Sequence, residues 1–259
     1  MKAVDVVVLV GGRGTRLGGV DKATVVVDGQ MLLSRLLASF EAEADDGAGA
    51  RLGQVVVVGR AQVPPWVRSA LEDPPGSGPV AAIAAGLATL SRGRSPSMWT
   101  LVLAVDQPGA PEAVPQLCSA VESEQSRDPG VRARALVPVD AEGRWQWLLA
   151  AYGTDALREA ILGLDDLVGA PMHRVFTQLT VRVADVDHDL LGDIDTPADL
   201  KRWNGTLTAH NTVSHGRTLE GSPTTTASGR SRAAGTTRAG AAAPTRPSPP
   251  ERQPDGQAG

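Results

Sequence analysis

The fold is decided near the start of the chain, where an apolar run leads into a glycine-rich stretch that reads Val6-Val7-Val8-Leu9-Val10-Gly11-Gly12-Arg13-Gly14-Thr15-Arg16-Leu17-Gly18-Gly19-Val20-Asp21-Lys22. The apolar part is typical of a parallel strand that is covered on both faces. Closely spaced glycines let backbone N–H groups approach an anion, and Arg16 and Lys22 add positive charge. Because ligands of open α/β sheets bind beyond the carboxyl ends of the strands, this stretch predicts a site for the phosphates of a nucleotide.

Further strands are indicated by Val-rich or alternating runs along the chain. They are expected at residues 55–58, 101–105, 136–139, 145–151 and 180–186. The segment 140–144 between two of them has the composition of a hairpin turn, which makes those two strands antiparallel. The sheet is therefore predicted to be mixed, although mostly parallel.

Helices are indicated between these strands by apolar residues at helical spacing. They are expected over residues 31–40, 80–90, 112–121 and 154–162. A last helix begins at Thr196 and Pro197, which are typical of an N-cap and a first helical position. Alternation of strands and helices predicts the α/β class, as a single doubly wound domain of three layers.

The composition changes beyond the last predicted helix. Residues 1–204 carry the alternating pattern, whereas residues 205–259 are rich in Thr, Ser, Gly, Ala, Pro and Arg and poor in large apolar side chains. Such a segment cannot bury enough apolar surface to fold by itself. We expect one domain over residues 1–204 and a disordered, low-complexity tail, whose arginines offer a contact for a protein partner.

The overall charge and the cysteine content exclude several classes of protein. Lys+Arg 25 against Asp+Glu 29 gives a net charge of −4, so that nucleic acid is not an expected partner. Cys118 is the single cysteine and excludes an internal disulfide. No apolar run is long enough to span a membrane, and Asp5 stands where a signal peptide is cationic or apolar. A soluble protein of the cytoplasm is predicted.

Two well-known glycine motifs fit the quoted stretch poorly. A dinucleotide-binding fingerprint that starts at Gly12 has Leu17 in place of its third glycine, and the segment that follows reads as extended chain with a turn at Asp28. A P-loop requires Gly-Lys followed by Ser or Thr, whereas Lys22 lies between Asp21 and Ala23. Dehydrogenase and P-loop functions are therefore disfavoured.

The spacing G-G-x-x-x-R-L-G-x-x-D-K after an apolar strand resembles that of the nucleotidyltransferase family that includes molybdenum cofactor guanylyltransferase and sugar-phosphate nucleotidylyltransferases. Three later segments resemble motifs of the same family in the same order: Gly78-Pro79-Val80-Ala81-Ala82-Ile83, Asp106-Gln107-Pro108 and Asp193-Ile194-Asp195-Thr196-Pro197. The resemblance covers residues 1–204 and implies the Rossmann-like fold of the nucleotide-diphospho-sugar transferases.

The resemblance also implies roles for particular residues. The expected catalytic residues are Arg16, Lys22 and Asp106. The nucleotide is expected to contact Leu9, Val10, Gly11, Gly12, Lys22, Asp73 and Asp106. Mg²⁺ is the expected cofactor, with Asp106 as the main ligand and Asp195, rather than Asp193, as the second. Carboxylates and phosphate oxygens are the ligands that Mg²⁺ prefers, which agrees with this assignment.

The implied reaction is transfer of GMP from GTP to the phosphate of a molybdopterin-type molybdenum cofactor, with release of pyrophosphate. A cytidylyltransferase that acts on molybdopterin or another phosphate acceptor, and a catalytically inactive nucleotide-binding protein, are the alternatives. Gly59 stands where guanylyltransferases often have Asn, so the choice of base is left open. Trp145 and Trp147 fit a ring-stacking site for the acceptor and a core-facing strand equally well, and Arg174 is a candidate for its phosphate.

Overall fold

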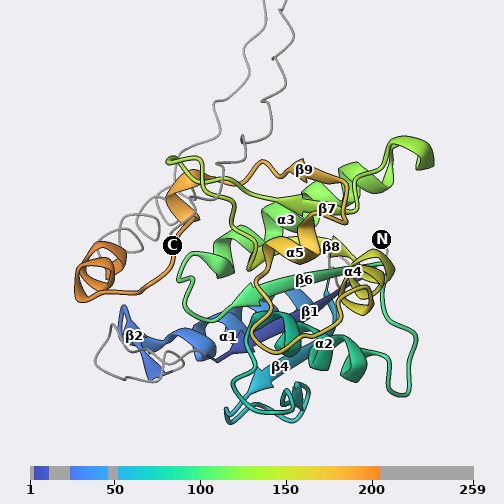
Figure 1. Cartoon of the computed structure of the whole chain (residues 1–259). Helices are drawn as coiled ribbons and strands as arrows, with labels where there is room; N and C mark the ends of the chain where they lie inside the picture. The colour runs from blue at the N-terminus through green and yellow to red at the C-terminus, as the bar shows by residue number, and fades with distance from the viewer. Residues whose placement is uncertain (1–2, 12–23, 46–51, 205–259) are drawn as a thin grey trace, which may run out of the picture. The chain divides into compact units, whose positions relative to one another are not determined.

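A seven-stranded sheet organises the part of the chain that this computed structural model describes, namely residues 3–11, 24–45 and 52–204. All of these residues belong to one unit of the chain, Met1–Thr218. The strand order is β5-β4-β1-β6-β8-β7-β9, and its central part is visible in Figure 1. The strand that precedes the glycine-rich stretch, β1 (Val4–Val10), therefore lies in the interior of the sheet, between β4 and β6.

The sheet is mixed, as the sequence predicts. Parallel pairs join β1 to β4 (Leu52–Gly59) and to β6 (Trp99–Ala104), and β5 (Arg68–Ala70) extends the sheet beyond β4. On the other side, β8 (Leu149–Gly153) is antiparallel to both of its neighbours, β6 and β7 (Ala135–Val137). The last strand, β9 (Val181–Val183), is parallel to β7. One strand runs against the rest because the turn that precedes it is a hairpin.

Helices cover both faces of the sheet and make the three predicted layers. Along β1, Val6 and Val8 face a core shared with α1 (Leu32–Asp45) and α3 (Ala110–Gln125). Val7 faces a second core, to which α2 (Pro79–Leu90), α4 (Thr154–Leu162) and α5 (His173–Phe176) contribute. Successive side chains of a strand point to opposite faces, so a continuously apolar run is required to fill both cores.

Most predicted elements are confirmed, with shifted ends. All four predicted helices are present, and a helix over residues 197–204 follows Thr196. The expected strand at 145–151 begins only at Leu149, because Trp145 makes a single bridge to Val139 before the chain leaves the ladder. The sequence pattern missed the edge strand β5 and the short helices α5, η3 (Pro129–Val131) and η4 (His188–Leu190). Each of these is too short to show a periodicity.

A small hairpin follows the glycine-rich stretch. Its strands are β2 (Val26–Val27) and β3 (Gln30–Met31), and the turn residues Asp28 and Gly29 have φ values of 51° and 78°. Two central residues with positive φ match the twist of a two-residue hairpin, which confirms the predicted turn. The Asp28 N–H donates to the Oδ1 atom of Asn204 at 2.9 Å, which ties this hairpin to the orange helix of residues 197–204 in Figure 1.

None of the helices within the described ranges combines the length and the apolar character needed to cross a membrane.

Candidate active site

Asp106 lies just beyond the carboxyl end of β6, beside the end of β1. The Val105 N–H donates to the Leu9 carbonyl at 3.0 Å, so the backbone at Asp106 is anchored to the strand that carries the glycine-rich stretch. The Asp106 carbonyl in turn accepts from the Ile194 N–H at 2.9 Å. This second bond brings the Asp193-Ile194-Asp195 segment, which is remote in sequence, against the end of β6.

Close backbone packing supports this approach. Gly109 begins the turn into α3, and a Cβ atom at this position would lie 2.2 Å from the Leu190 carbonyl oxygen. Only glycine lets the two segments come so close, because real Cβ atoms keep more than about 3 Å from a carbonyl oxygen. The backbone at the start of α3 therefore packs directly against the end of η4, from which the chain continues to Asp193.

Three carboxylates meet at this point. Asp106, Asp193 and Asp195 each offer an oxygen atom, and these atoms all lie within 4.8 Å of one another. Asp193 is exposed, whereas Asp106 and Asp195 are partly buried. The structure thus unites Asp106 and Asp195, the two expected metal ligands, and adds Asp193, which the sequence offered only as the alternative.

A group of like charges at this spacing is stabilised when a cation binds to it. Two carboxylates about 4 Å apart repel each other by about 1 kcal/mol in water, and by about 4 kcal/mol near a protein surface. Oxygen ligands at this spacing are what Mg²⁺ accepts from a protein, and it completes its coordination with water and phosphate oxygens. The donor set therefore fits the magnesium ion that the sequence implies.

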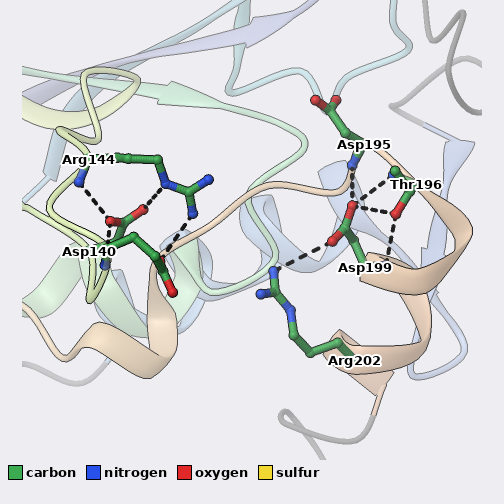
Figure 2. Close-up of polar contacts among 7 residues, drawn as sticks. Asp140, Arg144, Asp195, Thr196, Asp199 and Arg202 are labelled. Atoms are coloured by element: carbon green, nitrogen blue, oxygen red, sulfur yellow. Dashed lines mark hydrogen bonds and ion pairs between the residues drawn. The ribbon is translucent and has the colours of Figure 1, made fainter.

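The helix of residues 197–204 is capped by its own first turn, next to Asp195. The Asp199 carboxylate accepts from the Thr196 N–H and hydroxyl, both at 2.8 Å, and the Thr196 hydroxyl accepts from the Asp199 N–H at 3.2 Å. The hydrogen bond from the Thr196 side chain is the largest of the contacts that lower the pKa of Asp199. Figure 2 shows the Asp195 carboxylate pointing away from this cap, although its backbone N–H donates to Asp199. The reciprocal bonds form a capping box.

Arg35 of α1 supports the loop that carries Asp106. Its guanidinium group donates to the Pro108 carbonyl and to the Glu112 carboxylate, and its side chain is only 13% exposed. Because α1 follows the glycine-rich stretch and the β2–β3 hairpin, Arg35 links that part of the chain to the Asp106-Gln107-Pro108 turn. No sequence signal distinguished Arg35 from the other arginines, since the contact joins two separate helices.

The predicted phosphate-binding residues are described only in part. Gly12, Arg16 and Lys22 lie outside the described residues. Leu9 and Val10 are buried strand residues, and Gly11 is exposed at the point where β1 ends. The backbone groups that the sequence assigns to the nucleotide therefore stand at the carboxyl edge of the sheet, one strand away from Asp106.

Gly59 has a structural reason to be glycine. Its φ is 127°, and a Cβ atom would lie 2.2 Å from the Val10 carbonyl oxygen, which belongs to its partner in the β1–β4 ladder. An Asn side chain at this position is incompatible with such a backbone. The departure from the guanylyltransferase pattern thus reflects the close approach of the two strand ends.

Asp73 is not part of the carboxylate group. It is exposed, in the loop between β5 and α2, before the Gly78 that precedes the first turn of α2. In the strand order, β4 and β1 separate this loop from Asp106. The structure therefore puts Asp73 at the same edge of the sheet as Asp106, but on the other side of β4 and β1.

The hairpin turn between β7 and β8 is built around a buried carboxylate. Asp140 is 4% exposed and accepts hydrogen bonds from the backbone N–H groups of Glu142 and Arg144, from Nε of Arg144 at 2.8 Å, and from Nε2 of Gln146 at 2.9 Å. Burial acts to raise the pKa of Asp140, but the hydrogen bonds and charge of Arg144, with the bond from Gln146, outweigh it and lower the pKa. Figure 2 shows this pair of side chains.

The two tryptophans after this turn belong to a stack of aromatic rings. Trp147 stacks on Phe176 of α5 with centroids 3.5 Å apart, and Trp145 stacks on Trp147 at 5.1 Å. Phe176 also contacts Tyr152, which is fully buried. The inner ring, Trp147, is thus packed against the core, whereas Trp145 is 40% exposed. The core-facing interpretation is confirmed for Trp147, and a ring-stacking site for the acceptor at Trp145 stays a prediction.

Comparison with known proteins gives a consistent result. The sequence profile described as the MobA-like NTP transferase domain matches residues 6–183. A molybdenum cofactor guanylyltransferase of Acidiphilium cryptum (strain JF-5) is 36% identical over 109 residues, which cover 40% of this chain. The matched region spans 51% of that relative, so the chain aligns with about half of its length.

Solved structures show the same fold. Molybdopterin-guanine dinucleotide biosynthesis protein A from Archaeoglobus fulgidus superposes with a TM-score of 0.54 at 24% identity, over 80% of this chain and 100% of that one. The 2-C-methyl-D-erythritol 4-phosphate cytidylyltransferase of Thermus thermophilus gives 0.52 at 19%, over 80% and 100%. At these identities the likeness concerns the fold alone. Since the family profile covers more than half of the chain, the protein belongs to the family of the MobA-like NTP transferase domain.

Proposed function

We propose that the chain is a Mg²⁺-dependent nucleotidyltransferase that transfers GMP from GTP to the phosphate of a molybdopterin-type molybdenum cofactor and releases pyrophosphate. The observation that carries this proposal is the meeting of Asp106, Asp193 and Asp195 beside the strand end from which the glycine-rich stretch departs. The proposed catalytic domain comprises residues 1–204, with residues 205–259 as a tail outside it.

The reaction needs alignment and charge neutralisation more than proton transfer. An oxygen of the acceptor phosphate forms a bond to the α-phosphorus of GTP, and the bond from that phosphorus to the bridging oxygen breaks, so that pyrophosphate leaves with the electron pair. A phosphate monoester is largely dianionic at neutral pH, because its second pKa is about 6. No general base is required, which agrees with a group of side chains that contains carboxylates and no histidine.

We assign the charged residues to the metal ion, the phosphates and the nucleoside. Asp106, Asp195 and Asp193 would hold Mg²⁺, which neutralises phosphate charge when bound. Arg16 and Lys22, outside the described residues, are assigned to the β- and γ-phosphates. Asp73 is assigned to the nucleoside, where a carboxylate can accept hydrogen bonds from the guanine edge or the ribose.

Two observations support the choice of substrates. The relative that is 36% identical over its matched part is named a guanylyltransferase, which favours GTP. The ring of Trp145 stacks on Trp147 with one face, and the residue is 40% exposed. An exposed aromatic ring of this kind suits a planar acceptor such as a pterin. Arg174, exposed at the start of α5, is a second candidate for a contact with the acceptor.

The test is a thermal-shift series with GTP, CTP, ATP and UTP, each with and without Mg²⁺, followed by an assay of pyrophosphate release with molybdopterin. Stabilisation by GTP that increases with Mg²⁺, together with turnover, is the expected result. A preference for CTP would support the cytidylyltransferase. Binding of GTP without turnover would support an inactive nucleotide-binding protein, and no response to any triphosphate would overturn the proposal.

A further inference from the structure

The turn that Asp140 organises projects from the same edge of the sheet as Asp106. β7 runs parallel to β6 through the antiparallel β8, so the carboxyl end of β7 and the beginning of β8 lie at this edge. The Leu148 carbonyl accepts from the Ala104 N–H at 2.7 Å, directly before the loop that carries Asp106. The turn that precedes Leu148 and includes Arg144 therefore lies on the same side of the sheet as the loop of Asp106.

Arg144 is held along one edge of its guanidinium group. Nε donates to Asp140 at 2.8 Å and Nη2 donates to Glu142 at 3.2 Å, and these two nitrogens lie on one edge of the guanidinium group. The side chain is nevertheless 69% exposed. The exposed pair with Glu142 contributes little to stability, whereas the buried Asp140 carboxylate fixes one edge of the guanidinium group. A planar guanidinium group held in this way suits a phosphate.

Arg144 interacts electrostatically with one of the three carboxylates, Asp193. Its hydrogen bond to Asp140 and the charge of Asp140 raise the pKa of Arg144, and the charges of Glu142 and Asp193 raise it further. Asp140 and Glu142 belong to the same turn, whereas Asp193 belongs to the site on the neighbouring segment. Arg144 and Asp193 therefore attract each other across the two segments.

Under the proposed function, the strand order predicts which substrate lies on this side. The glycine-rich stretch follows β1, Asp106 follows β6, and the turn with Arg144 lies beyond β6, on the side of β8 and β7. In-line displacement requires the attacking and the leaving oxygen atoms to stand on opposite sides of the α-phosphorus. The proposed function assigns the triphosphate to residues of the glycine-rich stretch. It therefore predicts that the attacking phosphate approaches from the side of Arg144.

We propose that Arg144 binds the phosphate group of the acceptor substrate, and that Asp140 is a positioning residue that fixes Arg144 for this contact. The identification of that phosphate as the acceptor's rests on the proposed function, whereas binding of a phosphate by Arg144 does not. A phosphate of the nucleoside triphosphate has the same chemistry and is the other group that Arg144 could bind. Separate titrations with inorganic phosphate and with a GTP analogue distinguish the two.

The experiment compares the full chain with Arg144→Ala, Arg144→Lys and Asp140→Asn. Arg134→Ala is the matched control, because Arg134 is an exposed arginine paired with an exposed glutamate, Glu159, away from the turn. Calorimetric titrations use potassium phosphate and, separately, α,β-methylene-GTP with Mg²⁺, at constant ionic strength. Circular dichroism and thermal melting verify that each variant is folded.

Loss of Arg144 is expected to weaken the binding of phosphate about tenfold or more. The binding of the GTP analogue should weaken by less than about twofold. Lysine should restore part of the affinity, since it keeps the charge and loses the fork. Asp140→Asn should weaken phosphate binding severalfold although Arg144 is present, and should raise KM for the acceptor more than it lowers kcat. The control should equal the wild type.

Two outcomes overturn the inference. Phosphate affinity that is the same in Arg144→Ala and in the wild type, including no measurable binding by either, removes Arg144 from the site. A loss confined to the GTP analogue assigns Arg144 to the triphosphate instead of the acceptor. Failure of the proposed function is a separate result, namely no pyrophosphate release by the wild type from any triphosphate, and it leaves the phosphate titration interpretable.

Discussion

The two ends of the central strands carry aspartates in opposite circumstances. At the amino end of β1, Asp5 is fully buried and accepts hydrogen bonds from the Gln54 N–H at 2.7 Å and from the N–H and hydroxyl of Ser97 at 2.6 and 3.0 Å. At the carboxyl edge, Asp106 stands with Asp193 and Asp195 in a group of three like charges. The Asp5 carboxylate is satisfied by hydrogen bonds from neighbouring segments, whereas the three carboxylates at the other edge lie close enough together to share a cation.

The difference predicts that the amino end contributes to stability and, under the proposed function, that the carboxyl edge contributes to catalysis. A buried carboxylate with its hydrogen bonds satisfied ties β1, β4 and the loop before β6 together. Carboxylates close to one another weaken the fold unless a cation is bound, and such an arrangement persists where function requires it. The two ends should therefore respond in opposite ways to removal of a carboxylate.

The largest effect is expected for Asp106→Asn. Pyrophosphate release should fall by about 10³-fold or more, which corresponds to about 4 kcal/mol of transition-state stabilisation, because the main metal ligand is lost. The melting temperature should stay the same or rise, since one like charge is removed. Parallel assays of turnover and thermal melting check both parts. A variant that keeps more than about a tenth of the activity would show that the carboxyl edge is not where the metal acts.

Asp5→Ala should show the opposite pattern. Its removal leaves buried N–H groups without an acceptor, and hydrogen bonds to charged groups contribute about 1.5–3 kcal/mol, so the free energy of unfolding should fall by about 3 kcal/mol. Turnover per folded molecule should be unchanged. Urea unfolding measures the loss, with Asp155→Ala as the control, because the Asp155 side chain is 88% exposed and pairs only with Arg158 among the described residues. Equal stability of the two variants would contradict the assignment.

Mg²⁺ should stabilise the carboxyl edge alone. A cation present at about ten times its Kd adds about 1.4 kcal/mol, which raises the melting temperature of a protein of this size by about 3–5 °C. Asp193→Asn and Asp195→Asn should each abolish most of this rise. Asp189→Asn is the matched control, because Asp189 is exposed nearby in η4 and is not one of the three acids that meet. A rise that persists in both ligand variants would place the cation elsewhere.

The smallest effect concerns the pH dependence of the Asp140 turn. Because the pKa of Asp140 is lowered in the folded state, its contribution to stability is present above the unfolded pKa of about 3.9 and is lost as the pH falls through the folded pKa. The wild type should exceed Asp140→Asn by about 1 kcal/mol at neutral pH. Urea unfolding between pH 7 and the acid limit measures the difference, which should shrink below about pH 4. A difference that does not depend on pH would mean that shape rather than charge holds the turn.

Much of this architecture follows from local sequence. The valine-rich runs of β1 and β4 predict strands buried on both faces, and Thr196 followed by Pro197 marks a helix start, since these signals reside in a few neighbouring residues. Asp106 and Asp195 were identified from motif spacing, and the structure brings their carboxylates together. The edge strand β5 was missed because three residues, Arg68–Ala70, pair with a neighbour without any pattern of their own.

The class of fold follows from the chain alone, because the burial pattern is a local property, and the resemblance of its motifs to a known family points to two of the three carboxylates that meet. Three other features required the folded arrangement: Asp193 joins the two expected ligands, Arg35 supports the loop of Asp106, and Gly59 lies against the Val10 carbonyl. The same holds for Arg144, which Asp140 fixes beside that edge. These contacts join segments that are remote along the chain, and their geometry depends on strand order and register, which no single segment encodes.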